Sequence, residues 1–185
     1  MIIADALKGI IDQKTVNVLN KNNQTVSMAI NFHYGDQKEL LRWVKLKNNA
    51  KKVKYPLVWY IFNEFTELDG FYSTDVTFAI MQINEDLNAL NDKRTAISYV
   101  NVINPVFEKV KELLFESGKI EVFGKSYQTL FTQRDEPNFG VDINNQDYKS
   151  SDFKSVKQIG TQSIVTDIVD AKFVNLKMRI NLNNC

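Results

Sequence analysis

The fold of this chain is decided by residues 73–118, which read STDVTFAIMQINEDLNALNDKRTAISYVNVINPVFEKVKELLFESG. The run Val76–Ile83 is almost wholly apolar and β-branched, which predicts a central strand covered on both faces. After a polar loop over residues 84–93, apolar side chains recur at spacings of three and four. They predict a long helix with one buried stripe: Ile97, Val100, Ile103, Phe107, Val110 and Leu114. Gly118 follows the last apolar turn, where a left-handed helix cap forms easily.

Pro105 lies inside this helical pattern. Proline lacks a backbone N–H and its ring clashes with the preceding turn, so a regular α-helix is disturbed there. We therefore expect either a bend near Asn104 or two helices, the second capped by Asn104 with Pro105 at its first position.

The N-terminal part of the chain predicts two short helices and a hairpin. Apolar spacing favours a helix over residues 2–13 and a hairpin over residues 16–32. Alternate residues of the second hairpin strand would share one face: Val26, Met28, Ile30 and Phe32. Asp36 and Glu39 have the spacing of a capping box in front of a helix over residues 37–47.

Further strands are expected in the rest of the chain. Residues 55–62 form a second continuous apolar run, with Pro56 confined to its start as strand chemistry requires. Short strands are expected at residues 120–123 and 127–131. Residues 174–182 alternate strictly, which places one set on a core and the other in water. The core set is Val174, Leu176, Met178, Ile180 and Leu182, and the polar set is Asn175, Lys177, Arg179 and Asn181.

Length and composition fit one soluble domain over residues 1–185. The chain is 44% hydrophobic and 24% charged, and its net charge of +1 exerts no global attraction on nucleic acid or anionic membrane. No apolar run approaches the roughly 20 residues that span a bilayer as a helix. Without regular strand–helix alternation, the prediction is an α+β fold: a mainly antiparallel sheet of four to six strands with a long helix and one or two shorter helices packed on one side.

Residue types that enzymes and metal sites need are scarce. His33 is the single histidine and Cys185 the single cysteine, so a structural histidine and an exposed terminal thiol are the favoured interpretations. Glu64, Glu67 and Asp69 lack the ligand spacing of a calcium loop, which favours a solvated acidic loop. No nucleophile elbow, phosphate loop or dinucleotide fingerprint occurs. We therefore expect no metal, no cofactor and no catalysis.

One basic run has two interpretations. Its residues, which follow Arg42, are Lys45, Lys47, Lys51, Lys52 and Lys54. They suit a patch that faces phosphates, and they equally suit a solvated helix end and loop. No aromatic residue lies between them to stack on bases, which favours the second interpretation.

Residues 132–157 are rich in turn-forming residues and predict a long loop or arm. Three aromatic residues within it are candidate anchors for neighbouring subunits or a partner: Phe139, Tyr148 and Phe153.

Several segments, in this order, resemble small neck and tail proteins of tailed bacteriophages, and more narrowly their tail terminator proteins. They are Phe32-His33-Tyr34-Gly35 and the helix that follows it, Lys54–Trp59, the strand Asp75–Ile83, the loop ending Asp92-Lys93-Arg94, the long helix with Pro105, and the terminal strand Asp167–Lys172. The resemblance covers roughly residues 16–182 and consists of apolar patterns without a catalytic motif. The arm at residues 132–157 departs from the minimal terminator core.

The resemblance implies an α+β virion protein that acts through subunit interfaces. Such proteins form a ring, usually hexameric, that ends the tail tube and faces the head connector. The implied partners are copies of the chain, the tube and connector proteins, and DNA passing through the lumen, with no membrane. Assembly would take place in the host cytoplasm. A different neck role (head completion or stopper), a stand-alone binding module and an unfamiliar enzyme are the alternatives.

Overall fold

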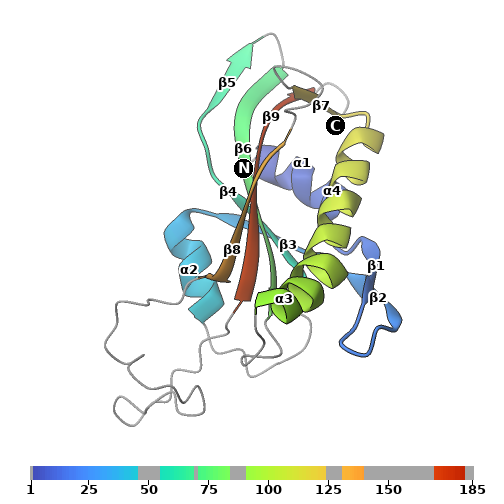
Figure 1. Cartoon of the computed structure of the whole chain (residues 1–185). Coiled ribbons are helices and arrows are strands. Elements are labelled where there is room, and N and C mark those ends of the chain that lie inside the picture. Colours follow the sequence, from blue (N-terminus) through green and yellow to red (C-terminus); the bar gives the residue numbers. More distant parts are fainter. Residues whose placement is uncertain are drawn as a thin grey trace.

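The computed structural model describes residues 2–45, 55–68, 71–83, 91–123, 131–139 and 169–181 (Figure 1). The elements in chain order are α1 (Ile2–Ile11), β1 (Thr15–Leu19), β2 (Thr25–Ala29), β3 (Asn31–Gly35), α2 (Gln37–Lys45), β4 (Leu57–Ile61), β5 (Phe65–Leu68), β6 (Phe71–Ile83), α3 (Asn91–Arg94), η1 (Thr95–Ile103), α4 (Asn104–Glu116), β7 (Ile120–Phe123), β8 (Thr132–Phe139) and β9 (Val169–Asn181).

The main sheet is built around β6. Within the described residues, seven strands join this sheet, in the order β3-β4-β6-β9-β7, with β5 also paired to β6 and β8 to β9. Among these described strands only β3 and β4 pair in parallel, and β1 and β2 form a separate antiparallel hairpin. The predicted α+β class, the mainly antiparallel sheet and the central position of Val76–Ile83 are confirmed. The main sheet has more strands than the four to six expected.

Helices cover both faces of the sheet, which corrects the prediction that they pack on one side. On one face, α1, the η1–α4 helix and the β1–β2 hairpin pack on alternate residues of the strands, including Val58, Phe78 and Val174. On the other face, Leu40 and Val44 of α2 pack on the intervening residues. Figure 1 shows α2 and α4 on opposite sides of the strands. Two apolar faces explain why β4 and β6 are nearly continuous in apolar residues.

The long helix runs from Asn91 to Glu116 without a break, and its middle part, η1, is a π-helix. The N–H of Asn104 bonds to the carbonyl of Tyr99, five residues back, immediately before Pro105. The wider π-helical turn therefore ends next to Pro105, which has no backbone N–H to donate. Gly118 has a φ of +63°, which confirms the predicted left-handed cap.

The π-helix also changes which side chains face the sheet. Turns closed by hydrogen bonds between residues five apart contain more residues than α-turns. Residues spaced by three and four therefore no longer lie on one face of the helix. Val100, predicted to be buried, is 56% exposed, whereas Ser98 and Tyr99 are buried. Beyond the π-helix the predicted stripe holds, because the residues Phe107, Val110 and Leu114 are all buried.

The predicted hairpin strand over residues 26–32 is two strands that pair with different partners. Ile30 separates them: its N–H and its carbonyl bond to the backbone of residues 14 and 13. The N–H of Asn31 then bonds to the carbonyl of Pro56, at the start of the β3–β4 pairing. Val26, Met28, Ile30 and Phe32 do pack on one core, as the alternation predicted.

The predicted capping box opens α2. The N–H of Glu39 bonds to Oδ1 of Asp36 at 2.7 Å, and the N–H of Asp36 bonds to Oε2 of Glu39 at 2.9 Å. Two of the donors that a helix start leaves free are thereby satisfied.

Residues 132–139, expected to begin an irregular arm, form the edge strand β8. This strand pairs antiparallel with β9 along residues 169–175. The remaining arm residues, 140–157, lie outside the described residues. In β9 the predicted alternation is confirmed, since Val174, Leu176, Met178 and Ile180 are buried.

Candidate functional site

Two exposed phenylalanines, each beside a partly buried tyrosine, lie on the β4–β5 side of the sheet. The ring of Phe62, which follows β4, lies 5.6 Å from the ring of Tyr34, and Phe65 on β5 lies 5.4 Å from Tyr72. Phe62 is 46% exposed and Phe65 is 55% exposed. We call Tyr34, Phe62, Phe65 and Tyr72 the aromatic edge. Large exposed apolar groups of this kind mark interaction surfaces when they occur together.

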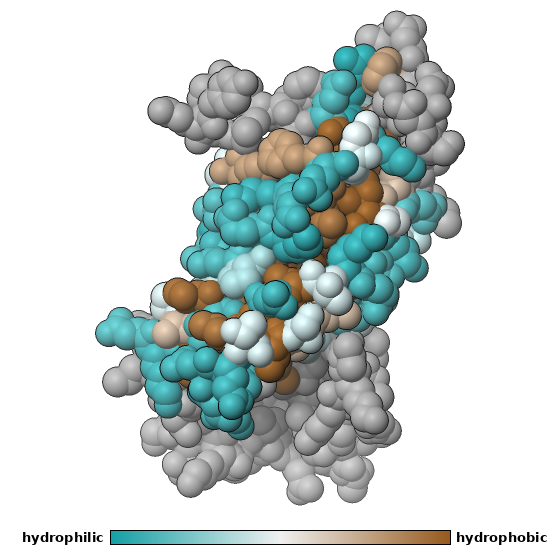
Figure 2. All heavy atoms as spheres, turned by 90° about the vertical axis from the view of Figure 1, so that its right-hand side faces the viewer, coloured by the Kyte–Doolittle hydropathy of each residue, from teal (hydrophilic) through white to brown (hydrophobic). Residues whose placement is uncertain are grey.

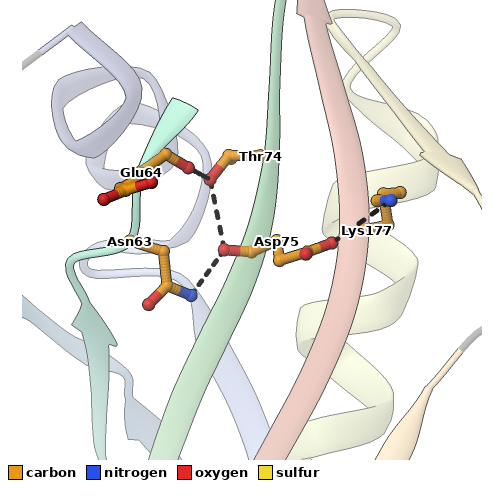
Figure 3. A network of polar contacts seen from close by, with 5 residues as sticks. All are labelled: Asn63, Glu64, Thr74, Asp75 and Lys177. Atoms are coloured by element: carbon orange, nitrogen blue, oxygen red, sulfur yellow. Dashed lines mark hydrogen bonds and ion pairs between the residues drawn. The ribbon is translucent and has the colours of Figure 1, made fainter. Parts of the chain in front are cut away.

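A polar network on β6 holds this edge in place (Figure 3). Asn63 donates its side-chain N–H to the carbonyl of Asp75, and the Thr74 hydroxyl donates to the carbonyl of Glu64 at 2.7 Å. Both bonds pin the segment between Phe62 and Phe65 to the neighbouring strand. The two phenylalanines are thus presented at the surface from a fixed backbone, which lowers the ordering cost of binding a partner.

Carboxylates border the aromatic edge. Glu64 and Glu67 are exposed, and a side-chain hydrogen bond with Glu67 raises the pKa of Tyr72. Apolar anchors with a polar rim are the usual composition of a protein interface. These glutamates were expected in a solvated acidic loop. Instead Glu67 belongs to β5, which pairs with β6.

The opposite side of the molecule carries separate exposed apolar residues. Leu19 on the hairpin, Val100 on η1 and Phe115 on α4 are 37%, 56% and 52% exposed. Figure 2 views this side and shows hydrophobic patches between hydrophilic ones. An open groove of about 540 Å³ separates β1 from α4. Its lining is mostly polar: Thr15, Val16, Asn17, Pro105, Glu108, Lys109 and Glu112.

Polar side chains that are buried or nearly so collect where the first part of the long helix packs on β6 and β9. We call them the polar layer: Gln82, Arg94, Ser98, Tyr99, Asp170 and Lys172. Gln82 and Asp170 are register partners on adjacent strands, and Arg94 Nε lies 3.9 Å from Asp170 Oδ1. Lys172 Nζ lies 2.9 Å from Asp135 Oδ1 on β8. The polar layer could not be predicted from the sequence, because the three-and-four spacing places Val100 toward the sheet and not Ser98 and Tyr99.

Tyr99 stays neutral in this layer. Burial raises the pKa of its hydroxyl well above the ordinary value, and the Asp170 and Asp135 carboxylates raise it further. The hydroxyl donates to the carbonyl of Ala171 at 3.3 Å.

This shift predicts a pH dependence of stability. Up to about pH 10 tyrosine is neutral in both states. Above that, only the unfolded state ionises at Tyr99, so stability falls as pH rises. At pH 8 we expect Tyr99→Phe to melt below the wild type, because it loses a hydrogen bond worth about 1 kcal/mol. Melting curves at pH 8 and pH 11 should show this difference shrinking. A constant difference would contradict the assignment.

Of the three predicted aromatic anchors, Phe139 is part of the domain's own core. It is 4% exposed, and its ring lies 5.2 Å from that of Phe173. This corrects its assignment to an interface, because the strand β8 carries it onto the sheet. Tyr148 and Phe153 lie outside the described residues, so their roles stay predictions.

Most of the basic run also lies outside the described residues. Lys45 is the last residue of α2, and the positions of Lys47, Lys51, Lys52 and Lys54 are not described.

His33 lies in an aromatic setting. Its ring is 5.0 Å from that of Trp43 and 6.0 Å from that of Trp59. Partial burial lowers the pKa of His33, the Asp12 carboxylate opposes this effect, and Lys8 adds to it. Across the described segments, no three histidine, cysteine, aspartate or glutamate side chains are grouped to hold a metal ion. The helices described here include none that is both long and apolar enough to cross a membrane.

Comparisons with protein-family models, with curated proteins and with solved structures give no match for this chain.

Proposed function

We propose that this chain is a structural subunit of the neck or tail of a tailed bacteriophage, which assembles into a ring in the manner of a tail terminator protein. In this proposal it works through contacts with copies of itself, with the tail tube and with the head connector, and it catalyses no reaction. Six copies per ring is the number that the resemblance implies. The virion is then its final location.

The observation that carries the proposal is the aromatic edge. Phe62 and Phe65 are about half exposed and are held by bonds from Asn63 and Thr74 to a neighbouring strand. A protein that acts alone gains nothing from fixing two phenylalanines in water, whereas an interface uses such residues as anchors.

A ring needs two different surfaces on each subunit, because the contact between neighbours is head-to-tail. The aromatic edge supplies one of them. Val100 and Phe115 on the long helix supply exposed apolar groups elsewhere on the molecule. We therefore assign the helix side as the second surface, which receives the aromatic edge of the next subunit.

The test is the size of the protein in solution. We expect the wild type to form a closed oligomer by light scattering, and the double variant Phe62→Ser with Phe65→Ser to be a monomer. Both side chains are about half exposed and lie outside the buried core, so the variant should keep cooperative melting. Thr66→Ser, an exposed position on the same strand, is the matched control and should keep the oligomer.

Two results would contradict the proposal. One is a wild type that stays monomeric at tens of micromolar concentration, alone and with tail tube protein. The other is a double variant with the same size as the wild type, which would remove the aromatic edge from the interface.

A further inference from the structure

The polar layer contains two deeply buried side chains, Ser98 and Gln82. Ser98 is 1% exposed and Gln82 is 8% exposed. Ser98 Oγ and Gln82 Oε1 have no hydrogen-bond partner among the described residues. The two side chains come from the two elements that meet here, η1 and β6. Gln82 pairs in register with Asp170 on β9, and Ser98 follows Arg94 by four residues along the long helix.

Such atoms are rare in native proteins, because losing water without gaining a partner is unfavourable. Where several buried polar groups converge, a buried water molecule commonly supplies the missing hydrogen bonds, since one water makes about three of them. The polar layer offers such groups around Asp170, whose neighbours are Gln82 in register and Arg94. Arg94 Nε and Asp170 Oδ1 are 3.9 Å apart, longer than a direct hydrogen bond and suited to bridging.

We propose that the polar layer is a binding site for ordered water between η1 and the β6–β9 pair. The water molecules bond to Ser98 Oγ and to Gln82 Oε1 and bridge Arg94 to Asp170. They let a π-helix with polar residues on its inner side lie on the sheet. The hydrated layer also specifies one position of the helix on the sheet, because a shift of the helix would leave these polar groups without their hydrogen bonds. This site is independent of the proposed ring.

The first experiment measures whether the substitution Ser98→Ala lowers or raises the melting temperature. If Ser98 is hydrated, Ser98→Ala loses a hydrogen bond and we expect the melting temperature to fall by about 2–4 °C. If the hydroxyl is buried dry, the same change removes an unsatisfied group and gains helix propensity, so the melting temperature would rise. Thr95→Ala, at an exposed position of the same helix, is the matched control and should not lower it.

The second experiment examines the native protein directly. A crystal structure at about 1.5 Å resolution should show water within hydrogen-bond distance of Ser98 Oγ and Gln82 Oε1. Direct contact between protein groups at this place, a dry gap or density for a larger molecule would overturn the proposal. An unchanged or higher melting temperature for Ser98→Ala would overturn it as well.

Discussion

Leu176→Asp should leave almost no folded protein. Leu176 on β9 is 5% exposed and lies opposite Val76, which is fully buried, in the core beneath the long helix. Truncating a buried leucine alone costs about 2–5 kcal/mol, and an unpaired buried carboxylate adds several more. This approaches the whole stability of a typical domain, about 5–15 kcal/mol. Soluble yield and circular-dichroism melting measure the result.

The adjacent Lys177→Asp is the control for this prediction. The Lys177 side chain is 63% exposed, and its ion partner Asp75, 3.7 Å away, is 75% exposed. Exposed pairs of this kind contribute about 0–1 kcal/mol, so the variant should fold and melt close to the wild type. Equal loss of folded protein in both variants would mean that the two faces of β9 are assigned wrongly.

Phe139→Ala should lower the melting temperature strongly. The Phe139 ring packs edge-on against Phe173, which is 6% exposed, in the core that α2 covers. Replacing a buried phenylalanine with alanine costs about 3–5 kcal/mol, which in a chain of this length corresponds to roughly 6–20 °C. Thermal melting of the purified variant measures the effect.

Thr132→Ala is the control on the same strand. Thr132 is exposed, so a shift of only a few degrees is expected. If Phe139→Ala melts like the wild type and changes only the size in solution, Phe139 acts at an interface, as the sequence alone had suggested.

The aromatic edge had a signal in the sequence. Asp69-Gly70 stands between Phe65-Thr66-Glu67-Leu68 and Phe71-Tyr72, and an Asp-Gly pair flanked by apolar residues is typical of a hairpin. The carboxylates in this stretch favoured an acidic loop instead, so the strand β5 was not predicted. The exposure of Phe62 had no such signal, because the residue continues an apolar run whose other members are buried.

The local structure could be predicted from the sequence alone. The capping box at Asp36, the cap at Gly118, the central strand Val76–Ile83 and the alternation of β9 follow from residue type and spacing. Each of these features depends on residues only a few positions away, so a short stretch of sequence is enough to predict it.

The contacts between distant segments could not be predicted from the sequence. In the folded chain β3 pairs with β4 instead of continuing the hairpin, α2 packs on the far face, and the polar strand β8 pairs with β9. Asp170 and Lys172 are buried, near Arg94 and Asp135. An edge strand and a buried charge are stabilised by residues far away in the sequence. The local spacing of apolar and polar residues does not depend on those partners, so it cannot predict them.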